Sequence, residues 1–419
     1  MTSLSLLLWI ALGISLQLAL WLGISFWQHW LGYLALRGGG PEATPVLPVA
    51  AAVLPAASAA WSGFREFRVE RRVIEDAAQS ICSFYLAPTD GETLPPFLPG
   101  QFLTFRLDLP TTSGETEQIV RCYSLSDAPR PDAFRISVKR VPAPPGSDLP
   151  PGRSSNHLHE RVGVGSILQV RAPGGHFHID GGSAPVVLIG GGIGITPMLS
   201  MLNWCLEQQP GREIWLFYGV RNSREPIMKA QLENLATSHP DFHLRLCFSD
   251  PLPEDLAGRD YHHHGRVDIV LLRQELPLRP YHFYICGPTP MMASLVGGLE
   301  DWGVPDERIH FEAFGPASIP RRQVAPAPVV PEGASDIVVT FAKSGKQLPW
   351  QAAAGSLLEF AEAHGIVVDT GCRAGGCGTC QTTILAGEVS YRAPPDFDPE
   401  PGSCLLCASS PKTSVTLEA

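Results

Sequence analysis

The 419-residue sequence is poor in cysteine and has no strongly basic stretch. Ten cysteines in 419 residues is a far lower density than that of a small disulfide-stabilised scaffold. The net charge of −10, without a basic stripe that would neutralise phosphates, argues against nucleic-acid binding. Half of the cysteines lie within residues 372–407. That uneven placement favours a metal site in a reducing compartment over a disulfide framework.

Charged side chains are absent from residues 1–36. The apolar run over residues 4–27 exceeds the ~20 residues that a helix needs to cross a bilayer. Three aromatic residues lie at its end, where an interfacial belt would sit: Trp27, Trp30 and Tyr33. A secretory signal peptide is the alternative, but it needs a positive amino-terminal region that this sequence lacks. We therefore predict a single-pass transmembrane anchor over residues 1–36. Arginines occur only after it, which predicts that the soluble domains lie on the cytoplasmic side.

Two segments of different composition follow the predicted anchor. Residues 37–62 are rich in Gly, Ala and Pro and are predicted to form a tether. A second membrane span is the alternative, but repeated prolines interrupt the apolar run. Residues 63–181 contain short β-rich runs that alternate apolar with polar residues and are separated by turn signals. This pattern predicts an antiparallel β-barrel.

The pattern changes in residues 182–318. Apolar runs there alternate with helix-like segments, at residues 184–192, 213–220, 243–250 and 281–287. Buried strands that alternate with helices predict an α/β domain with a parallel sheet. Residues 319–333 are Pro-rich and are predicted to be a linker. Residues 334–419 carry the crowded cysteines and are predicted to form a separate small domain.

The crowded cysteines have a diagnostic spacing. Cys372, Cys377 and Cys380 are spaced C-x4-C-x2-C, and Cys407 follows at a distance. Plant-type [2Fe–2S] ferredoxins bind their cluster with four cysteines in this arrangement. Structural zinc and free thiols are the alternatives, but zinc ribbons use paired C-x2-C hooks. These four cysteines are therefore the predicted ligands of a [2Fe–2S] cluster.

The last block resembles a plant-type ferredoxin domain over its whole length, which implies an α+β, β-grasp fold. In that family a leucine stands two residues before the last ligand, as Leu405 does before Cys407 here. The resemblance implies that Cys404, the fifth thiol of the group, is not a ligand.

A glycine-rich stretch, GGGIGITP at residues 190–197, follows the first apolar run of the α/β block. Such glycines permit tight turns, and the helix after them directs its N-terminus at a phosphate. Alone the signal is weak, and a generic glycine-rich turn is the alternative. Two other runs end in YGVRN at residues 218–222 and CGPTPMM at residues 286–292. Because ligands bind beyond the carboxyl ends of strands in open α/β sheets, the three loops are predicted to converge.

Two stretches of the β-rich block have the composition of an anion site. RCYSLSD at residues 121–127 puts a cation, an aromatic ring and two hydroxyls on one strand. PGRSSNHLHE at residues 151–160 resembles a helix start, with serines and an asparagine ahead of a helical pattern. A plain strand pair and a capped helix are the alternatives.

Taken in order, these motifs resemble the ferredoxin–NADP reductase superfamily over residues 64–318. The matching positions are R-x-Y-S at 121–124, G-x-x-S-N at 152–156, G-G-x-G-x-T-P at 191–197, C-G-P at 286–288 and E-x-F-G at 312–315. The domain order, flavin, nicotinamide and then [2Fe–2S], is similar to that of one-chain reductases that serve oxygenases and hybrid-cluster proteins. Residues 151–160 and 310–316 look most like the reductase half of flavohaemoglobins.

The resemblance implies a role for each motif. Cys286 would sit near the transferred hydride, and Phe314 would shield the flavin until nicotinamide displaces it. Residues that would contact the flavin and its phosphate are Arg121, Tyr123, Ser124, Gly152, Ser155 and Asn156. Residues that would contact the nicotinamide cofactor are Gly191, Gly192, Gly194, Thr196, Pro197, Arg221, Gly287 and Pro288. The flavin is expected to be FAD, with FMN as the alternative.

Two further features bear on ligands. Arg221 and Arg224 favour NADPH, since an arginine can meet a 2′-phosphate, but exposed arginines are common on such loops and the choice of NADH or NADPH stays open. The tract YHHHG at residues 261–265 is predicted to be a solvated loop and not a metal site, because adjacent histidines point in different directions.

Together the motifs predict a membrane-anchored, NAD(P)H-dependent electron-transfer reductase. A hydride would pass to FAD, and single electrons would leave through the [2Fe–2S] cluster. The expected acceptor is a membrane oxygenase, hydroxylase or desaturase, because anchoring both partners in one bilayer raises their effective concentration. A respiratory-type NADH:quinone reductase and a redox sensor are the alternatives.

Overall fold

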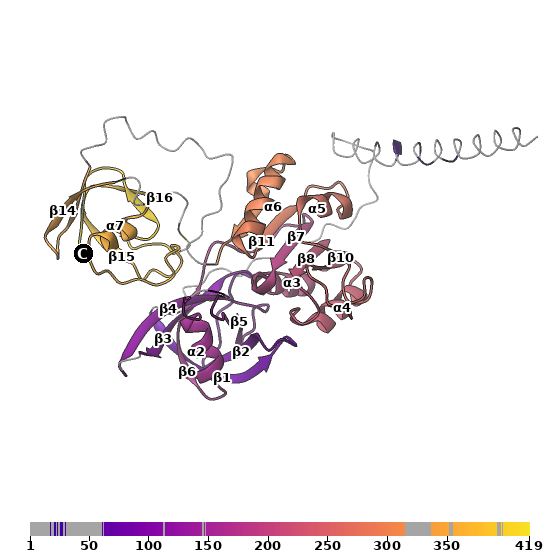
Figure 1. Ribbon diagram of the computed structural model, residues 1–419, viewed down its shortest axis with the longest axis horizontal. Coiled ribbons are helices and arrows are strands. Elements are labelled where there is room, and N and C mark those ends of the chain that lie inside the picture. The colour runs from indigo at the N-terminus through magenta and orange to yellow at the C-terminus, as the bar shows by residue number, and fades with distance from the viewer. Residues whose placement is uncertain are drawn as a thin grey trace, which may run out of the picture.

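Figure 1 shows the computed structural model of the chain, in which three folded units follow one another. The structure describes residues 63–111, 114–144, 148–314, 337–351, 355–391 and 397–419, together with a few single positions. Within that part of the chain, no helix is long and apolar enough to cross a membrane. The predicted anchor, tether and linker, at residues 1–36, 37–62 and 319–333, lie outside the described residues apart from isolated positions. The transmembrane helix therefore stays a prediction.

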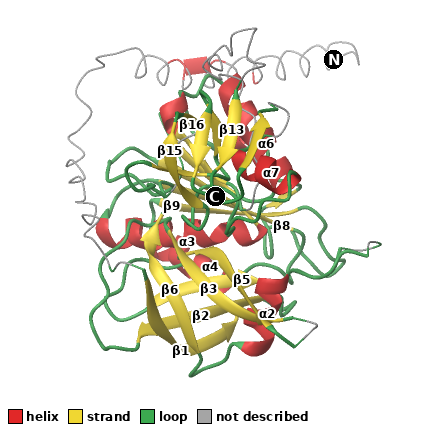
Figure 2. Ribbon diagram, turned by 90° about the vertical axis from the view of Figure 1, so that its left-hand side faces the viewer, coloured by secondary structure: helices red, strands yellow, loops and turns green. Residues whose placement is uncertain are grey.

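The first unit is an antiparallel sheet that curls on itself (Figure 2). Its strands are β1 (Phe64–Ile74), β2 (Ile81–Pro88), β3 (Phe102–Pro110), β4 (Thr116–Ser124), β5 (Phe134–Lys139) and β6 (Ile167–Gly174). Their order in the sheet is β4-β3-β6-β1-β2-β5, and all neighbours are antiparallel. Phe67, Phe84 and Phe105 are fully buried inside the curl. The predicted β-rich runs are thus confirmed as strands.

The predicted closed barrel is instead a half-barrel. Its end strands, β4 and β5, are not paired along their length, and an isolated bridge joins Leu125, just after β4, to Ile136 of β5. The backbone N–H of Ser126 donates to the carbonyl of Arg135 at 2.8 Å as part of this bridge, so the two end strands meet only at this point. As a result the R-x-Y-S motif lies on an edge strand. Helix α2 (Arg153–Arg161) packs against β3 and β5.

The second unit is a parallel sheet covered on both faces. Its strands are β7 (Val186–Gly191), β8 (Ile214–Val220), β9 (Phe242–Phe248), β10 (His263–His264), β11 (His282–Cys286) and β12 (Ile309–Glu312). The order is β10-β9-β8-β7-β11-β12 with every pair parallel, which confirms the predicted α/β domain. The first strand of this domain, β7, lies near the centre of the sheet. Strands β8, β9 and β10 follow on one side of it and β11 and β12 on the other, so the strand order reverses between β7 and β11. Ligands bind at such a reversal.

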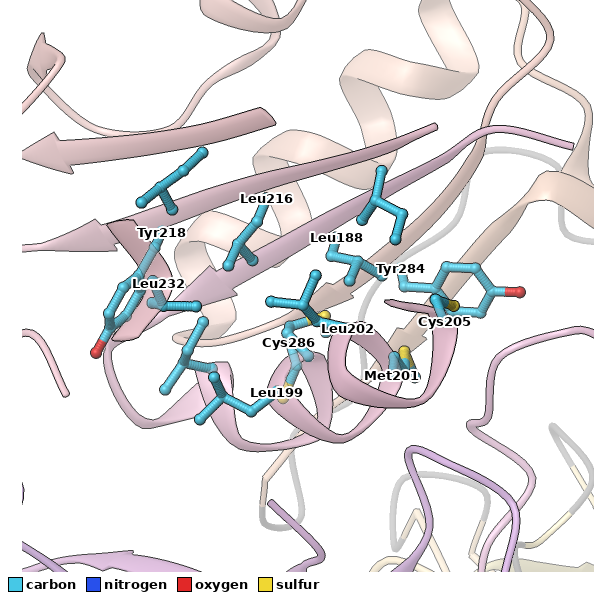
Figure 3. Packing of buried hydrophobic residues seen from close by; sticks show 14 of the residues in the cluster. Leu188, Leu199, Met201, Leu202, Cys205, Leu216, Tyr218, Leu232, Tyr284 and Cys286 are labelled. Atoms are coloured by element: carbon cyan, nitrogen blue, oxygen red, sulfur yellow. The ribbon is translucent and has the colours of Figure 1, made fainter. Parts of the chain in front are cut away.

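Apolar side chains fill both faces of this sheet. The covering helices are α3 (Ile195–Gln208) and α4 (Lys229–Ser238) on one face, and α5 (Ile269–Glu275) and α6 (Thr289–Asp301) on the other. Figure 3 shows Leu188 and Leu216 of the strands lying over Leu199 and Leu202 of α3. This packing fixes the start of α3 against the carboxyl ends of the central strands.

The histidine tract differs from the prediction of a solvated loop. His263 and His264 form the short edge strand β10, in which His263 pairs with Cys247 of β9. His262 accepts a hydrogen bond at Nδ1 from the backbone N–H of Leu246, at 2.9 Å. The tract therefore extends the sheet, because its backbone finds partners on the free edge of β9.

The third unit is an α+β domain, as predicted. Its main sheet has the order β14-β13-β19-β15-β17, and a second pair joins β16 to β18. The strands are β13 (Val338–Phe341), β14 (Lys346–Pro349), β15 (Gln381–Ala386), β16 (Val389–Tyr391), β17 (Ser403–Leu405), β18 (Ser409–Pro411) and β19 (Val415–Leu417). Helix α7 (Leu357–Ala363) begins at a capping box formed by Ser356 and Glu359.

The strand reversal makes one glycine indispensable. A Cβ atom on Gly194 would lie 2.2 Å from the carbonyl oxygen of Cys286, so no side chain fits between α3 and the end of β11. We expect Gly194→Ala to destabilise the α/β domain by about 1–3 kcal/mol through overpacking. Thermal unfolding of the full chain, followed by circular dichroism, measures the loss as a lower Tm.

Gly297 of α6 provides the matched control, because a Cβ atom there would meet nothing within 4 Å. Gly297→Ala should leave Tm unchanged or raise it slightly, since alanine favours the helix. Equal destabilisation by both substitutions would contradict the close-approach argument.

Candidate functional site

The four predicted cluster ligands come together in two pairs. The Sγ atoms of Cys380 and Cys407 are 3.2 Å apart. The backbone N–H of Cys372 donates to Sγ of Cys377 at 3.2 Å, and a hydrogen bond between the two thiols raises the pKa of Cys377. Residues 371–380, called the cluster loop below, thus fold around their own sulfur atoms.

Backbone N–H groups of the cluster loop also point at the sulfurs. The N–H of Gly376 donates to Sγ of Cys372 at 3.2 Å, and the N–H of Gly375 donates to Sγ of Cys407 at 3.2 Å. Gly375 has φ +76°, a left-handed conformation that a glycine adopts without strain. Hydrogen bonds of this kind tune the potential of an iron–sulfur cluster.

The donor set fits a two-iron cluster better than a single ion. Among the described residues, no three His, Cys, Asp or Glu side chains surround one metal position. A [2Fe–2S] cluster has no need of such a group, because each iron takes two thiolates and shares bridging sulfides. The pairs Cys372–Cys377 and Cys380–Cys407 would each supply the two thiolates that one iron needs.

The fifth thiol, that of Cys404, lies elsewhere. It is fully buried in the domain core beside Leu405, and its strand pairs it with Thr382. Burial raises the pKa of Cys404 to about 11. Cys404 thus packs as a small core side chain, and its role as a non-ligand stays a prediction.

The R-x-Y-S motif on β4 makes hydrogen bonds to three places: the start of α2, the cluster loop and the end of β12. The hydroxyl of Tyr123 lies 2.6 Å from Oγ of Ser154 at the start of α2. Arg121 donates from Nη1 to the carbonyl of Gly371 in the cluster loop, at 3.3 Å. Ser124 donates to Oε2 of Glu312 at 3.4 Å, which links β4 to the end of β12. One edge strand therefore touches both neighbouring domains.

The start of α2 has the features expected of a phosphate site. Gly152 caps the helix without a side-chain hydrogen bond. Ser155 and Asn156 are used to hold the preceding loop: Oγ of Ser155 accepts from the N–H of Val141 at 3.2 Å, and Nδ2 of Asn156 donates to the carbonyl of Val141 at 2.8 Å. These side chains leave the first backbone N–H groups of the helix without a side-chain cap, as an anion-binding helix start requires.

The glycine loops after β7 and β11 lie in direct contact, as predicted. A Cβ atom on Gly191 would lie 2.8 Å from Cδ of Pro288, and one on Gly287 would lie 3.0 Å from Cα of Gly191. Gly192 has φ +54° and open space above it. Thr196 donates to the carbonyl of Ile193 at 3.0 Å, which closes the first turn of α3. Bare backbone thus lines the reversal point, and a pyrophosphate can approach it closely.

The two residues predicted to act at the hydride differ in exposure. Cys286 is fully buried and lies over α3 (Figure 3). Burial, and then the charge of Glu312, raise the pKa of Cys286, so its thiol stays neutral. Phe314 is 45% exposed at the end of the described segment. Their contacts with cofactor stay predictions.

Further contacts that pattern reading missed hold the cluster loop on the half-barrel. Arg171 of β6 donates from Nη1 to the carbonyl of Cys377 at 2.7 Å. The ring of Phe102 lies 3.1 Å from the position that a Cβ atom on Gly376 would take. No motif marks these residues, because they are distant in sequence from what they touch.

Arg221 is held by an acidic partner. Its Nε donates to Oε1 of Glu225 at 2.6 Å, and its backbone N–H donates to Oε2 of Glu225 at 3.1 Å. Burial opposes ionisation of Glu225, but the hydrogen bonds from Arg221 outweigh it and lower its pKa. Asp250, which follows β9, donates its backbone N–H to the carbonyl of Arg221 at 2.8 Å.

Three family models match the chain in the predicted order. The oxidoreductase FAD-binding domain matches residues 73–179, the oxidoreductase NAD-binding domain matches residues 188–296, and the 2Fe-2S iron-sulfur cluster binding domain matches residues 339–412. These matches confirm the three predicted cofactors.

Curated relatives are flavohemoproteins. One from Halalkalibacterium halodurans is 38% identical over 258 residues, 61% of this chain and 61% of the relative. One from Rhizobium meliloti is 40% identical over 257 residues, 61% of this chain and 62% of the relative. The chain thus spans about three fifths of the length of these relatives.

Solved structures extend the similarity. The FAD/NAD-binding domain of a nitric oxide dioxygenase from Vibrio cholerae is 31% identical with a TM-score of 0.53, covering 61% of this chain and 100% of that one. Phthalate dioxygenase reductase is 25% identical with a TM-score of 0.50, covering 85% of this chain and 98% of that one. The chain is therefore a ferredoxin-reductase-type NAD(P)H oxidoreductase of the ferredoxin reductase-like superfamily, with FAD-binding, NAD-binding and 2Fe–2S domains.

Proposed function

We propose that this protein passes electrons from NADH through its FAD and [2Fe–2S] domains to a partner oxygenase at a membrane. The observation that carries the proposal is the contact between the cluster loop and the flavin-binding half-barrel. Arg121 and Arg171 both donate to carbonyl groups of that loop. Electron transfer needs the two cofactors to lie close together, and this contact supports such an arrangement.

Bound FAD would accept a hydride and the bound cluster would carry single electrons, so the polypeptide needs no general base. The chain's own contribution is to hold the partners in place. The Gly191–Pro288 contact offers bare backbone to a pyrophosphate, and the uncapped start of α2 offers N–H groups to the flavin phosphate. The thiol of Cys286 is buried and neutral, so it would add no charge if the nicotinamide bound beside it as proposed.

The hydrogen bond from Ser124 to Glu312 joins the flavin and nicotinamide domains at the strand ends. In the parallel ladder, Glu312 is the register partner of Cys286. The end of the R-x-Y-S strand therefore lies beside the carboxyl ends of β11 and β12. This supports a site in which nicotinamide and flavin meet between the two domains.

The likeness to phthalate dioxygenase reductase supports an oxygenase as acceptor. That protein is described as a modular structure for electron transfer from pyridine nucleotides to [2Fe–2S], and the alignment covers nearly all of it. We further propose that residues 1–36 hold the protein in a membrane with its soluble domains on the cytoplasmic side. The uncharged apolar run over residues 4–27 supports this placement.

NADH is the proposed donor because the arginine expected to meet a 2′-phosphate is already paired with a carboxylate. Arg221 is already paired with Glu225, and Asp250 follows the neighbouring strand. An acidic residue at this edge suits a free ribose 2′-hydroxyl, whereas a 2′-phosphate would be repelled. The pairing of Arg221 with Glu225 therefore counts against the weak preference for NADPH that Arg221 and Arg224 indicated in the sequence.

Cofactor preference can be measured as the ratio of kcat/KM for NADH to that for NADPH. We expect the unmodified protein to favour NADH by at least about tenfold, and Asp250→Asn to narrow the ratio several-fold, roughly 1 kcal/mol for one like-charge contact. Asp241→Asn removes the same charge at the amino end of β9, opposite the end that Asp250 follows, and should leave the ratio unchanged. A preference for NADPH in the unmodified protein would refute the argument.

The cluster assignment is tested by a pair of cysteine substitutions. Cys377→Ala should lose iron and the cluster's visible absorption and abolish cytochrome c reduction, while ferricyanide reduction by the flavin continues. Cys404→Ala should keep about two irons per chain, as a [2Fe–2S] cluster holds. Cytochrome c reduction that survives Cys377→Ala, or iron lost equally from both variants, would contradict the route. Quinone reduction by the purified protein alone would instead favour the respiratory alternative.

Membrane attachment is tested by deleting residues 1–60, which keeps Trp61 and its hydrogen bond to Val170 of the half-barrel, and separating cell extracts by ultracentrifugation. The full chain should sediment with membranes, and the shortened chain should stay in the supernatant with unchanged ferricyanide reduction. Recovery of the full chain in the supernatant would count against the anchor.

A further inference from the structure

Arg171 occupies a position between the half-barrel and the cluster loop. It lies on β6, whose neighbours β1 and β3 pair it with Phe64 and Thr104. Its guanidinium carbon is 5.0 Å from the ring centre of Phe64 and 5.6 Å from that of Phe397. Phe64 belongs to the half-barrel and Phe397 to the α+β domain. One half-buried side chain therefore contacts aromatic rings of both domains.

The same guanidinium reaches the cluster loop itself. Its Nη1 donates to the carbonyl of Cys377 at 2.7 Å, a short charge-assisted hydrogen bond. Phe397 is tied to the loop as well, because its backbone N–H donates to the carbonyl of Gly375 at 2.9 Å. A Cβ atom on Gly378 would lie 2.5 Å from the Phe397 ring, so ring and loop are in close contact. Arg171 thus contacts the loop directly, by its hydrogen bond to Cys377, and indirectly, through the ring of Phe397.

We propose that Arg171 is the positioning residue that holds the cluster loop against the flavin-binding strand and so sets the rate of electron transfer from flavin to cluster. It stands on a central strand of a hydrogen-bonded sheet, and a rigid element positions a contact more accurately than a loop does. Its planar guanidinium can stack between two rings while it donates in its own plane, which a lysine cannot do. The inference rests on the proposed function.

Other contacts at this boundary are weaker candidates for the same task. Arg121 donates to Gly371 at the longer distance of 3.3 Å and is exposed. His176 lies 3.8 Å from Asp398, a pair that attracts only when the histidine is protonated and whose carboxylate is open to solvent. Arg171 combines the shortest of these hydrogen bonds with two ring contacts.

The experiment uses the full chain loaded with both cofactors. Anaerobic stopped-flow mixing with NADH resolves two events: flavin bleaching, and cluster reduction at the visible absorption of the cluster. We expect Arg171→Ala to slow cluster reduction about tenfold or more, as loss of a charge-assisted hydrogen bond implies, with flavin bleaching unchanged. Arg171→Lys keeps the charge and loses the stacking. Its rate of cluster reduction should lie between those of the unmodified protein and Arg171→Ala.

Arg106→Ala is the matched control. Arg106 lies on the neighbouring strand β3, and its guanidinium carbon is 4.5 Å from the centre of the same Phe64 ring. None of its contacts among the described residues involves the α+β domain. Arg106→Ala should leave the rates of flavin bleaching and cluster reduction unchanged. Equal slowing by Arg106→Ala and Arg171→Ala, or no slowing by Arg171→Ala, would overturn the proposal.

Hydrogen–deuterium exchange gives a readout that does not depend on turnover. In the loaded Arg171→Ala protein, peptides from the cluster loop should exchange faster than in the unmodified protein, while peptides from β11 should not. Unchanged exchange in the loop would overturn the proposal even if the rates had changed. If the unmodified protein itself failed to reduce its cluster with NADH, the proposed function would fail, and the positioning role with it.

If Arg171→Ala failed to fold, Arg171→Lys would carry the test. Its flavin and iron contents should match those of the unmodified protein, with slower cluster reduction alone. Full-rate cluster reduction in Arg171→Lys would overturn the need for the planar, stacked guanidinium.

Discussion

Two backbone carbonyl groups of the cluster loop accept hydrogen bonds from arginines of the half-barrel, and the rest of the account depends on this contact. The carbonyl of Cys377 receives Arg171 at 2.7 Å, and that of Gly371 receives Arg121 at 3.3 Å. Carbonyl oxygens hold this position whatever the loop's side chains bind. The loop can therefore keep its sulfurs for the cluster and its carbonyls for the flavin domain. Without this contact, the flavin-binding half-barrel and the cluster domain would lack the hydrogen bonds that hold them together.

The boundary between the nicotinamide domain and the half-barrel depends on close backbone packing and one hydrogen bond. The contact of Gly194 with the carbonyl of Cys286 brings α3 against β11, and the Ser124–Glu312 hydrogen bond brings β4 to the same place. Because β4 is an edge strand of an open half-barrel, it can face the nicotinamide domain and the cluster loop at once. A closed barrel would have paired that edge with β5.

The local patterns were readable from the sequence, and the contacts between domains were not. Alternating apolar residues predicted the strands of the half-barrel, and the spacing of Cys372, Cys377 and Cys380 predicted a cluster, because both signals are short-range. The half-barrel's open seam depends on where the chain turns after β4, which no periodicity records. Arg171 was missed because it meets Cys377 only in the fold. Glu225 lies only four residues from Arg221, but no motif says that it neutralises that arginine, and only the structure shows the pair.

The central claim is that electrons cross from the flavin domain to the cluster domain within one chain. An anaerobic titration of the purified protein with NADH, followed by electron paramagnetic resonance, tests it most directly. The account predicts that NADH alone, without any partner, produces the signal of a reduced [2Fe–2S] cluster. A protein whose flavin bleaches while its cluster stays silent until dithionite is added would contradict it.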